Sequence, residues 1–169
     1  MRPAIRLRNR LPEAVRAATV GPGEKALAGA VTSDDRVVVG TRDALYVDDR
    51  RIPWESVERA EWDKENATLN VSEVGTWGQA RPAHALAIEA PGRLLELVRE
   101  RVTASIILQR HVPIHGKRGV VVIGRRAPSG NHAVQWVYEF DEGVDPDDSE
   151  VRRRAEAALV EARDEVGEL

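Results

Sequence analysis

The sequence predicts an α+β protein in which antiparallel strands are combined with two long helices. Two observations carry this prediction. Short apolar runs at residues 25–31, 36–40 and 44–47 are separated by polar turns, which is typical of an antiparallel meander. Two later segments, after Pro91 and after Asp145, instead repeat their apolar residues every three or four positions, as one face of a helix does.

The first part of the chain, residues 1–23, is predicted to be a basic arm followed by a short helix. Four arginines occur within the first ten residues. Leu11, Val15 and Ala18 then share one helical face, and the glycines of residues 21–23 indicate where that helix ends. An arginine-rich arm can contact a polyanion, although terminal arms are usually solvated.

Residues 24–106 are predicted to form the main sheet and its helix. After the first three strands, Ala60 and Trp62 alternate with charged residues, as half-buried strand positions do. An irregular loop at residues 74–82 contains Trp77 and precedes a further strand. The helix after Pro91 has one apolar face, formed by Leu94, Leu95, Val98 and Val102.

Residues 107–169 are predicted to add three strands and a C-terminal helix, packed on the same core. The strands are expected at residues 106–112, 119–125 and 132–140, and the middle one is apolar on both faces, which favours a central position. The apolar stripe of the helix contains Val151, Ala155, Ala158, Leu159, Ala162 and Val166. Residues 145–148, Asp-Pro-Asp-Asp, offer an N-cap, a proline at the first helical position and acids in the first turn, and Gly167 is placed to end the helix.

A family resemblance rests on two adjacent stretches. Residues 36–47 read RVVVGTRDALYV and residues 51–63 read RIPWESVERAEWD, and together they resemble bacterial pleckstrin-homology-like proteins. They are similar in particular to an uncharacterised actinobacterial family, in which a helix like that of residues 94–106 follows. The resemblance implies a strongly bent antiparallel sheet or barrel capped by a helix, with Trp54, Val57 and Trp62 in its core. It also implies a binding or scaffolding role.

Phosphoinositide binding is disfavoured by the turn between the first two strands. Lipid-binding members of the wider fold group place basic residues there, whereas this sequence has Ser33, Asp34 and Asp35. Two carboxylates repel an inositol phosphate.

Charge is segregated along the chain. Residues 91–140 carry 8 basic and 3 acidic side chains, whereas residues 141–169 carry 4 basic and 11 acidic ones. One interpretation is a surface that attracts an acidic protein or nucleic acid. The other is internal: the acidic end docks on the basic strands and neutralises them. The residues that we assign to a basic anion- or partner-binding surface are Arg99, Arg101, Arg110, Lys117, Arg118, Arg125 and Arg126.

Several kinds of chemistry have little support. The chain has no cysteine, so thiolate catalysis and disulfides are excluded. His111 and His115 have a spacing that suggests a metal site, but Pro113 and Gly116 disturb the strand between them. Ser105 lacks the glycines of a nucleophile elbow. We predict no metal, no cofactor and no catalytic residue.

The aromatic row of the last strand, formed by Trp136, Tyr138 and Phe140, allows two interpretations. Rings beside arginines can stack on the bases of single-stranded nucleic acid. The same row can instead be the packing surface of the alanine-rich C-terminal helix, and we favour this second interpretation.

The sequence therefore predicts a non-enzymatic interaction domain that binds a protein partner. The alternative is a nucleic-acid binder that uses residues 91–140, and an enzyme whose site is assembled from scattered residues is the third hypothesis. We expect a cytoplasmic protein without a transmembrane segment, because no long apolar run occurs. No oligomeric state is predicted.

Overall fold

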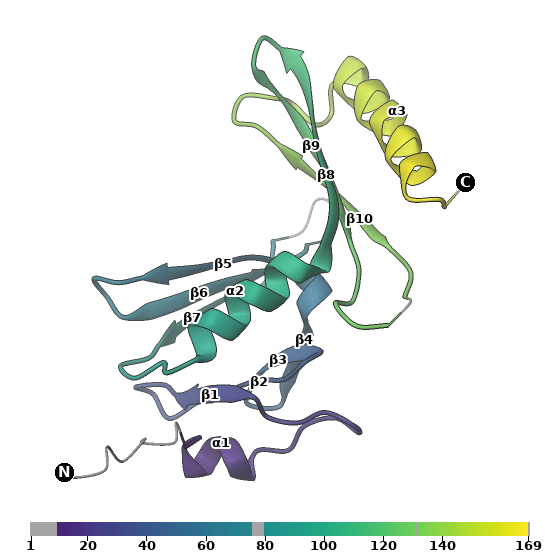
Figure 1. Cartoon of the computed structure of the whole chain (residues 1–169). Coiled ribbons are helices and arrows are strands. Elements are labelled where there is room, and N and C mark those ends of the chain that lie inside the picture. Colours follow the sequence, from purple (N-terminus) through teal and green to yellow (C-terminus); the bar gives the residue numbers. More distant parts are fainter. Residues whose placement is uncertain (1–9, 76–79, 131, 169) are drawn as a thin grey trace, which may run out of the picture. The chain divides into compact units, whose positions relative to one another are not determined.

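The computed structural model describes residues 10–75, 80–130 and 132–168. It is an α+β structure with three antiparallel sheets and a C-terminal helix (Figure 1). The chain divides into two compact units, one ending at Val102 and the other beginning at Thr103. The sequence analysis placed a boundary between residues 106 and 107. Trp77, in the predicted loop, lies outside the described residues.

The first sheet of the first unit is a four-stranded meander in the order β1-β2-β3-β4. Its strands are β1 (Ala28–Val31), β2 (Val37–Gly40), β3 (Ala44–Val47) and β4 (Arg50–Pro53). The tight turns depend on aspartates that adopt positive φ, 63° at Asp35 and 50° at Asp48. The carboxylate of Asp48 also accepts a hydrogen bond from the Val37 backbone N–H at 2.8 Å, which closes the turn between β3 and β4 onto β2.

The second sheet of the first unit has three strands in the order β5-β6-β7. They are β5 (Val57–Asp63), β6 (Thr68–Glu73) and β7 (Ala83–Ala87), and a short 3-10 helix, η1 (Trp54–Ser56), leads into β5. Helix α2 (Leu94–Ser105) follows. The two sheets remain separate, so the strands that the structure describes form no closed barrel.

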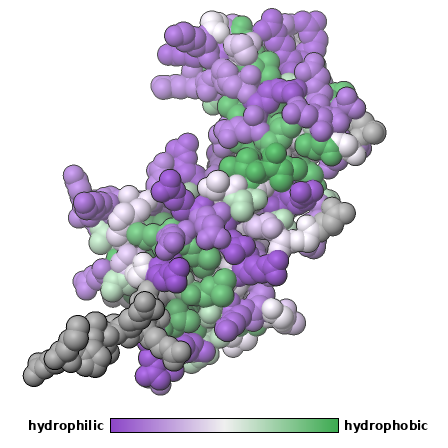
Figure 2. All heavy atoms as spheres, viewed as in Figure 1, coloured by the Kyte–Doolittle hydropathy of each residue, from purple (hydrophilic) through white to green (hydrophobic). Residues whose placement is uncertain are grey.

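The core of the first unit combines residues from both sheets with one face of α2. Trp54 and Val57 are fully buried and Trp62 is half-buried, so all three predicted core residues join this cluster. The indole N–H of Trp54 donates to the Thr41 carbonyl at 3.0 Å, which satisfies the polar atom of a buried ring. Hydrophilic residues cover most of the face in Figure 2, with hydrophobic patches showing between them.

The N-terminal segment covers the opposite face of the first sheet. Helix α1 (Glu13–Ala17) buries Val15 against Val39 and Tyr46 in a second apolar cluster. A Cβ atom at Gly29 would lie 2.6 Å from a Val15 methyl group and 2.5 Å from the Val38 carbonyl oxygen. Glycine at this position therefore allows α1 to approach the sheet. The predicted basic arm, residues 1–9, lies outside the described residues.

The second unit is a three-stranded sheet with one helix. Its strands are β8 (Ile106–His115), β9 (Arg118–Arg125) and β10 (Gln135–Phe140), and its helix is α3 (Ser149–Glu165). The order is β10-β9-β8, so the strand that is apolar on both faces is central, as predicted. The N-cap is Asp148, whose carboxylate accepts from the backbone N–H groups of Glu150 and Val151. None of the helices in the described part of the chain combines the length and hydropathy of a membrane span.

Candidate functional site

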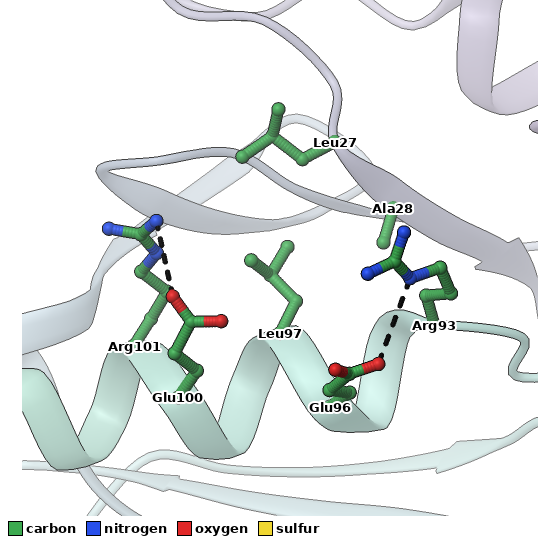
Figure 3. Close-up of a pocket in the computed structure, with 7 residues that line it drawn as sticks. All are labelled: Leu27, Ala28, Arg93, Glu96, Leu97, Glu100 and Arg101. Carbon is green, nitrogen blue, oxygen red and sulfur yellow. Dashed lines mark ion pairs between the residues drawn. The ribbon is translucent and has the colours of Figure 1, made fainter.

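A pocket of the first unit lies between the start of β1 and helix α2. It has a volume of about 270 Å³, and Figure 3 shows strand and helix on its two sides. Its lining consists of apolar Leu27, Ala28 and Leu97 and of charged Arg93, Glu96, Glu100 and Arg101. Since β1 is the end strand of its sheet, the pocket lies along a sheet edge.

The apolar part of this pocket depends on how α2 packs. Leu94 and Val98 are buried in the core, whereas Leu97, one position away on the helix, lies at the border between core and pocket. A Cβ atom at Gly40 would lie 2.5 Å from a Leu97 methyl group, so the glycine makes room for Leu97. Leu27 enters from the β1 side and is 45% exposed, although it is a large hydrophobic residue.

The charged part of the pocket consists of two ion pairs, one within α2 and one between α2 and Arg93, the residue just before it. Arg93 Nε lies 3.7 Å from a Glu96 carboxylate oxygen, and Arg101 Nη2 lies 3.5 Å from one of Glu100. Pairs as long and exposed as these contribute little to stability. The Arg101 side chain is only 22% exposed, and its buried Nε has no hydrogen-bond partner among the residues that the structure describes. Because the buried Nε is closed to a ligand, an added acceptor would bind the Nη groups of Arg101, whose contact with Glu100 is 3.5 Å long.

A second polar cluster joins the two sheets of the first unit around Glu73. Arg50 of β4 binds the Glu73 carboxylate with two nitrogens, the closest contact being 2.7 Å, and His84 Nε2 lies 2.7 Å from Glu73 Oε2. Burial raises the pKa of Glu73, but the hydrogen bonds from His84 and Arg50 outweigh this effect and leave it lowered. Because its carboxylate is held by two partners, Glu73 acts as a structural link.

No local sequence pattern places His84 beside a carboxylate, and the contact with Glu73 arises from the fold. His84 is paired with Val71 in the antiparallel register of β6 and β7, which leaves Glu73 diagonally opposite the histidine. A correct prediction of the register between β6 and β7 would have revealed the contact between His84 and Glu73.

A third polar cluster fixes the segment before β1 to the first sheet. The Glu24 carboxylate is only 6% exposed and accepts hydrogen bonds from Thr41 Oγ1 at 2.7 Å, from Arg51 Nε at 3.1 Å and from the Tyr46 hydroxyl. Burial raises the pKa of Glu24, but the bonds from Tyr46, Thr41 and Arg51 together leave it below its ordinary value. The cluster is fully engaged and has no room for a substrate group.

The predicted basic surface is divided between the units. Arg99 and Arg101 belong to α2 in the first unit, where Arg99 is exposed and Arg101 lines the pocket. The other five residues belong to the second unit. Among these, Arg125 is 2% exposed, which corrects its assignment to the surface: it lies between Ile106 of β8 and Gln135 of β10, and its side chain contacts the buried Ser105. Lys117 and Arg118 are exposed near the β8–β9 turn, and Arg126 is half-buried.

Arg110 shows what becomes of the basic strand residues. Its guanidinium pairs with Glu161 at 3.3 Å and also with Glu165, both on α3. The second unit as a whole carries 9 Lys and Arg residues against 12 Asp and Glu residues. Two glutamates of α3 thus pair with one basic residue of the sheet, Arg110, whereas Lys117 and Arg118 remain exposed.

The aromatic row of β10 is largely covered by the same helix. Trp136 and Tyr138 pack with Ala158, Leu159 and Ala162 of α3, and the Trp136 indole N–H donates to Glu168 at 2.8 Å. Burial against α3 and the nearby Glu156 carboxylate raise the pKa of Tyr138. Two of the three rings are therefore part of the helix interface and do not form an open stacking platform.

The remaining candidate groups are also engaged in structure. His111 Nε2 lies 2.9 Å from an Asp141 oxygen that also accepts from the Gly119 N–H at 2.7 Å. Ser105 is fully buried and contacts Arg125. No cluster of three or more metal-ligating side chains occurs within residues 10–75, 80–130 and 132–168.

Comparisons with protein-family models, with curated proteins and with solved structures find no match to this chain.

Proposed function

We propose that the protein is a non-enzymatic interaction domain whose first unit binds an extended segment of a protein partner. The observation that carries this proposal is the pocket between β1 and α2, which combines an exposed apolar side chain, Leu27, with a half-buried arginine, Arg101. An apolar surface beside a few polar anchors is the usual composition of a binding site. The lining contains no histidine, serine, threonine or tyrosine.

The arrangement of the first unit supports assigning it to the pleckstrin-homology-like group. The antiparallel strands of its two sheets are followed by a helix, as the resemblance implies, although the described strands form no closed barrel. On this proposal the first unit is a scaffold, and its function resides in the pocket between β1 and α2.

The size and position of the pocket favour an extended occupant. A volume of about 270 Å³ accepts one large side chain, not the face of a helix. Peptides often bind by adding a strand at an exposed sheet edge, where adjacent pockets select their side chains. An extended segment can follow β1 and place one apolar side chain between Leu27 and Leu97 (Figure 3).

The proposal is tested by selecting binders from a displayed library of random nine-residue peptides, with the full chain as bait. Selected peptides should bind the wild-type protein and lose about tenfold or more in affinity for Leu27→Glu, because a charge then stands where apolar contact is needed. The matched control is Val160→Glu, which changes an exposed apolar residue of α3 and should leave binding unchanged. Failure to select any peptide, or equal binding to Leu27→Glu, contradicts the proposal.

Nucleic-acid binding through residues 91–140 has less support. Its basic residues are divided between two units, Arg125 is buried and Arg110 is paired with α3. An enzymatic function also has less support, because the His84 and His111 pairs with carboxylates are both held by further hydrogen bonds or ion pairs.

A further inference from the structure

We propose that the pocket between β1 and α2 selects segments in which an apolar residue is flanked, two positions away, by acidic residues. This inference rests on the proposed function and specifies which partner segment the pocket accepts. The pattern is acidic–x–apolar–x–acidic, with the apolar side chain between Leu27 and Leu97 and a carboxylate on Arg101.

The spacing of the pattern follows from the geometry of α2. Arg93, Leu97 and Arg101 are four residues apart and form one stripe that lines the pocket, as Figure 3 shows. Successive members of the stripe are about 6 Å apart along the helix axis. Alternate side chains of an extended strand are about 6.6 Å apart on one face. A strand lying beside α2 therefore matches this stripe with every second side chain.

The apolar position of the pattern is set by Leu97 and Leu27. Leu97 is the middle residue of the stripe, and Leu27 lies across the pocket from it. Leu27 is a large apolar residue left 45% exposed at a sheet edge, so covering it removes apolar surface from water. The central residue of the segment is therefore expected to be leucine-like or aromatic.

The acidic positions are set by the arginines, and above all by Arg101. Glu96 and Glu100 also border the pocket, but their side chains are 71% and 62% exposed and remain well hydrated. Arg101 is 22% exposed, its nearest carboxylate contact is 3.5 Å long, and its buried Nε has no acceptor among the described residues. The buried Nε is closed to the segment, so a carboxylate of the segment would bind the two Nη groups of this guanidinium. Arg93, at the other end of the stripe, offers a second and more exposed position.

The test uses fluorescein-labelled peptides and fluorescence anisotropy with the full chain. The probe is GSDSLSDSG, and the comparison peptides replace both aspartates by asparagine or by lysine, or the leucine by serine. The aspartate peptide should bind about tenfold more tightly than the asparagine peptide, since charged hydrogen bonds are lost in the latter. The lysine and serine peptides should bind more weakly still.

Protein variants separate a specific contact from general attraction. Arg101→Gln should weaken binding of the aspartate peptide about tenfold and abolish its advantage over the asparagine peptide. Arg99→Gln is the matched control, because Arg99 is an exposed arginine of the same helix that does not line the pocket. Circular dichroism spectra of both variants are compared with that of the wild-type protein, as a check that the variants fold. Equal losses in the two variants overturn the inference, because they indicate nonspecific attraction.

The outcomes also separate this inference from the proposed function. If library-selected peptides depend on Leu27 but show no preference for aspartate over asparagine, the acidic pattern is wrong and the peptide-binding function stands. If no peptide depends on Leu27, both are overturned. Only an aspartate preference that Arg101→Gln removes and Arg99→Gln preserves supports the inference.

Discussion

The two units of the protein use the charged residues of their helices differently. In the second unit, Glu161 and Glu165 of α3 pair with Arg110 of the sheet beneath, so the charges help to fix the helix to its sheet. In the first unit, Arg93, just before α2, and Arg101 within it pair only loosely with glutamates of that helix. A run of basic residues in a sequence therefore does not define a basic surface, because a partner within the same unit can neutralise it.

The largest expected effect is on the core that supports the pocket. Trp54→Ala removes a fully buried indole and its hydrogen bond to Thr41 in the first unit. We expect a loss of about 3–5 kcal/mol in the free energy of unfolding, measured by urea denaturation. A loss below about 1 kcal/mol would show that η1 packs differently from this description.

A smaller loss is expected from Glu24→Gln. The amide keeps the shape of the side chain but loses the charge that Arg51 contacts, so stability should fall by about 2 kcal/mol at pH 7. The control is Glu65→Gln, at an exposed turn position, which should change stability by less than about 0.5 kcal/mol. Both values come from urea denaturation.

The stability of the first unit should depend on pH through the carboxylates of Glu24 and Glu73. The pKa values of Glu24 and Glu73 are both below the ordinary value of 4.5 in the folded chain. Their contribution to stability is therefore complete above pH 4.5 and is lost as the pH falls through the lower folded values. Thermal unfolding between pH 7 and pH 3 should show this decline, with a shallower decline in Glu24→Gln. Parallel curves for the two proteins would contradict the assignment.

The smallest expected effect concerns nucleic acid. Because α3 neutralises Arg110 and covers Trp136, the full chain should bind a labelled 20-nucleotide single strand only weakly, without the steep salt dependence of a multi-phosphate contact. Fluorescence anisotropy across a salt series measures this. Tight, salt-sensitive binding that disappears in a Lys117→Gln, Arg118→Gln double variant would restore the nucleic-acid hypothesis.

Local patterns predicted much of the fold. The spacing of the α3 stripe identified the buried face of that helix, but the predicted start was three residues too early, because Pro146 precedes the helix and the N-cap is Asp148. The two-sided apolar pattern of residues 119–125 identified the central strand of the second sheet. These features depend on residues that are neighbours in the sequence, which is why periodicity and capping can reveal them.

The candidate site could not be predicted in the same way. Arg101 was singled out, but as one member of a basic run, because nothing local indicates that Leu27, more than 70 positions earlier, lies across from it. The pairing of His84 with Glu73 required the register of two strands, and the burial of Arg125 required knowledge of the central strand's surroundings. Such long-range contacts appear only when the elements are assembled.

The glycine at position 40 controls more than the fit of one helix. Since an added methyl group there would meet the end of the Leu97 side chain, Gly40→Ala would push that side chain toward the opening and leave a shallower pocket. The backbone at position 40 lies in a regular strand and tolerates alanine. On the proposed function, Gly40 sets how large a side chain the pocket accepts although it does not line the pocket, so a change at this residue alters binding preference while the lining stays the same.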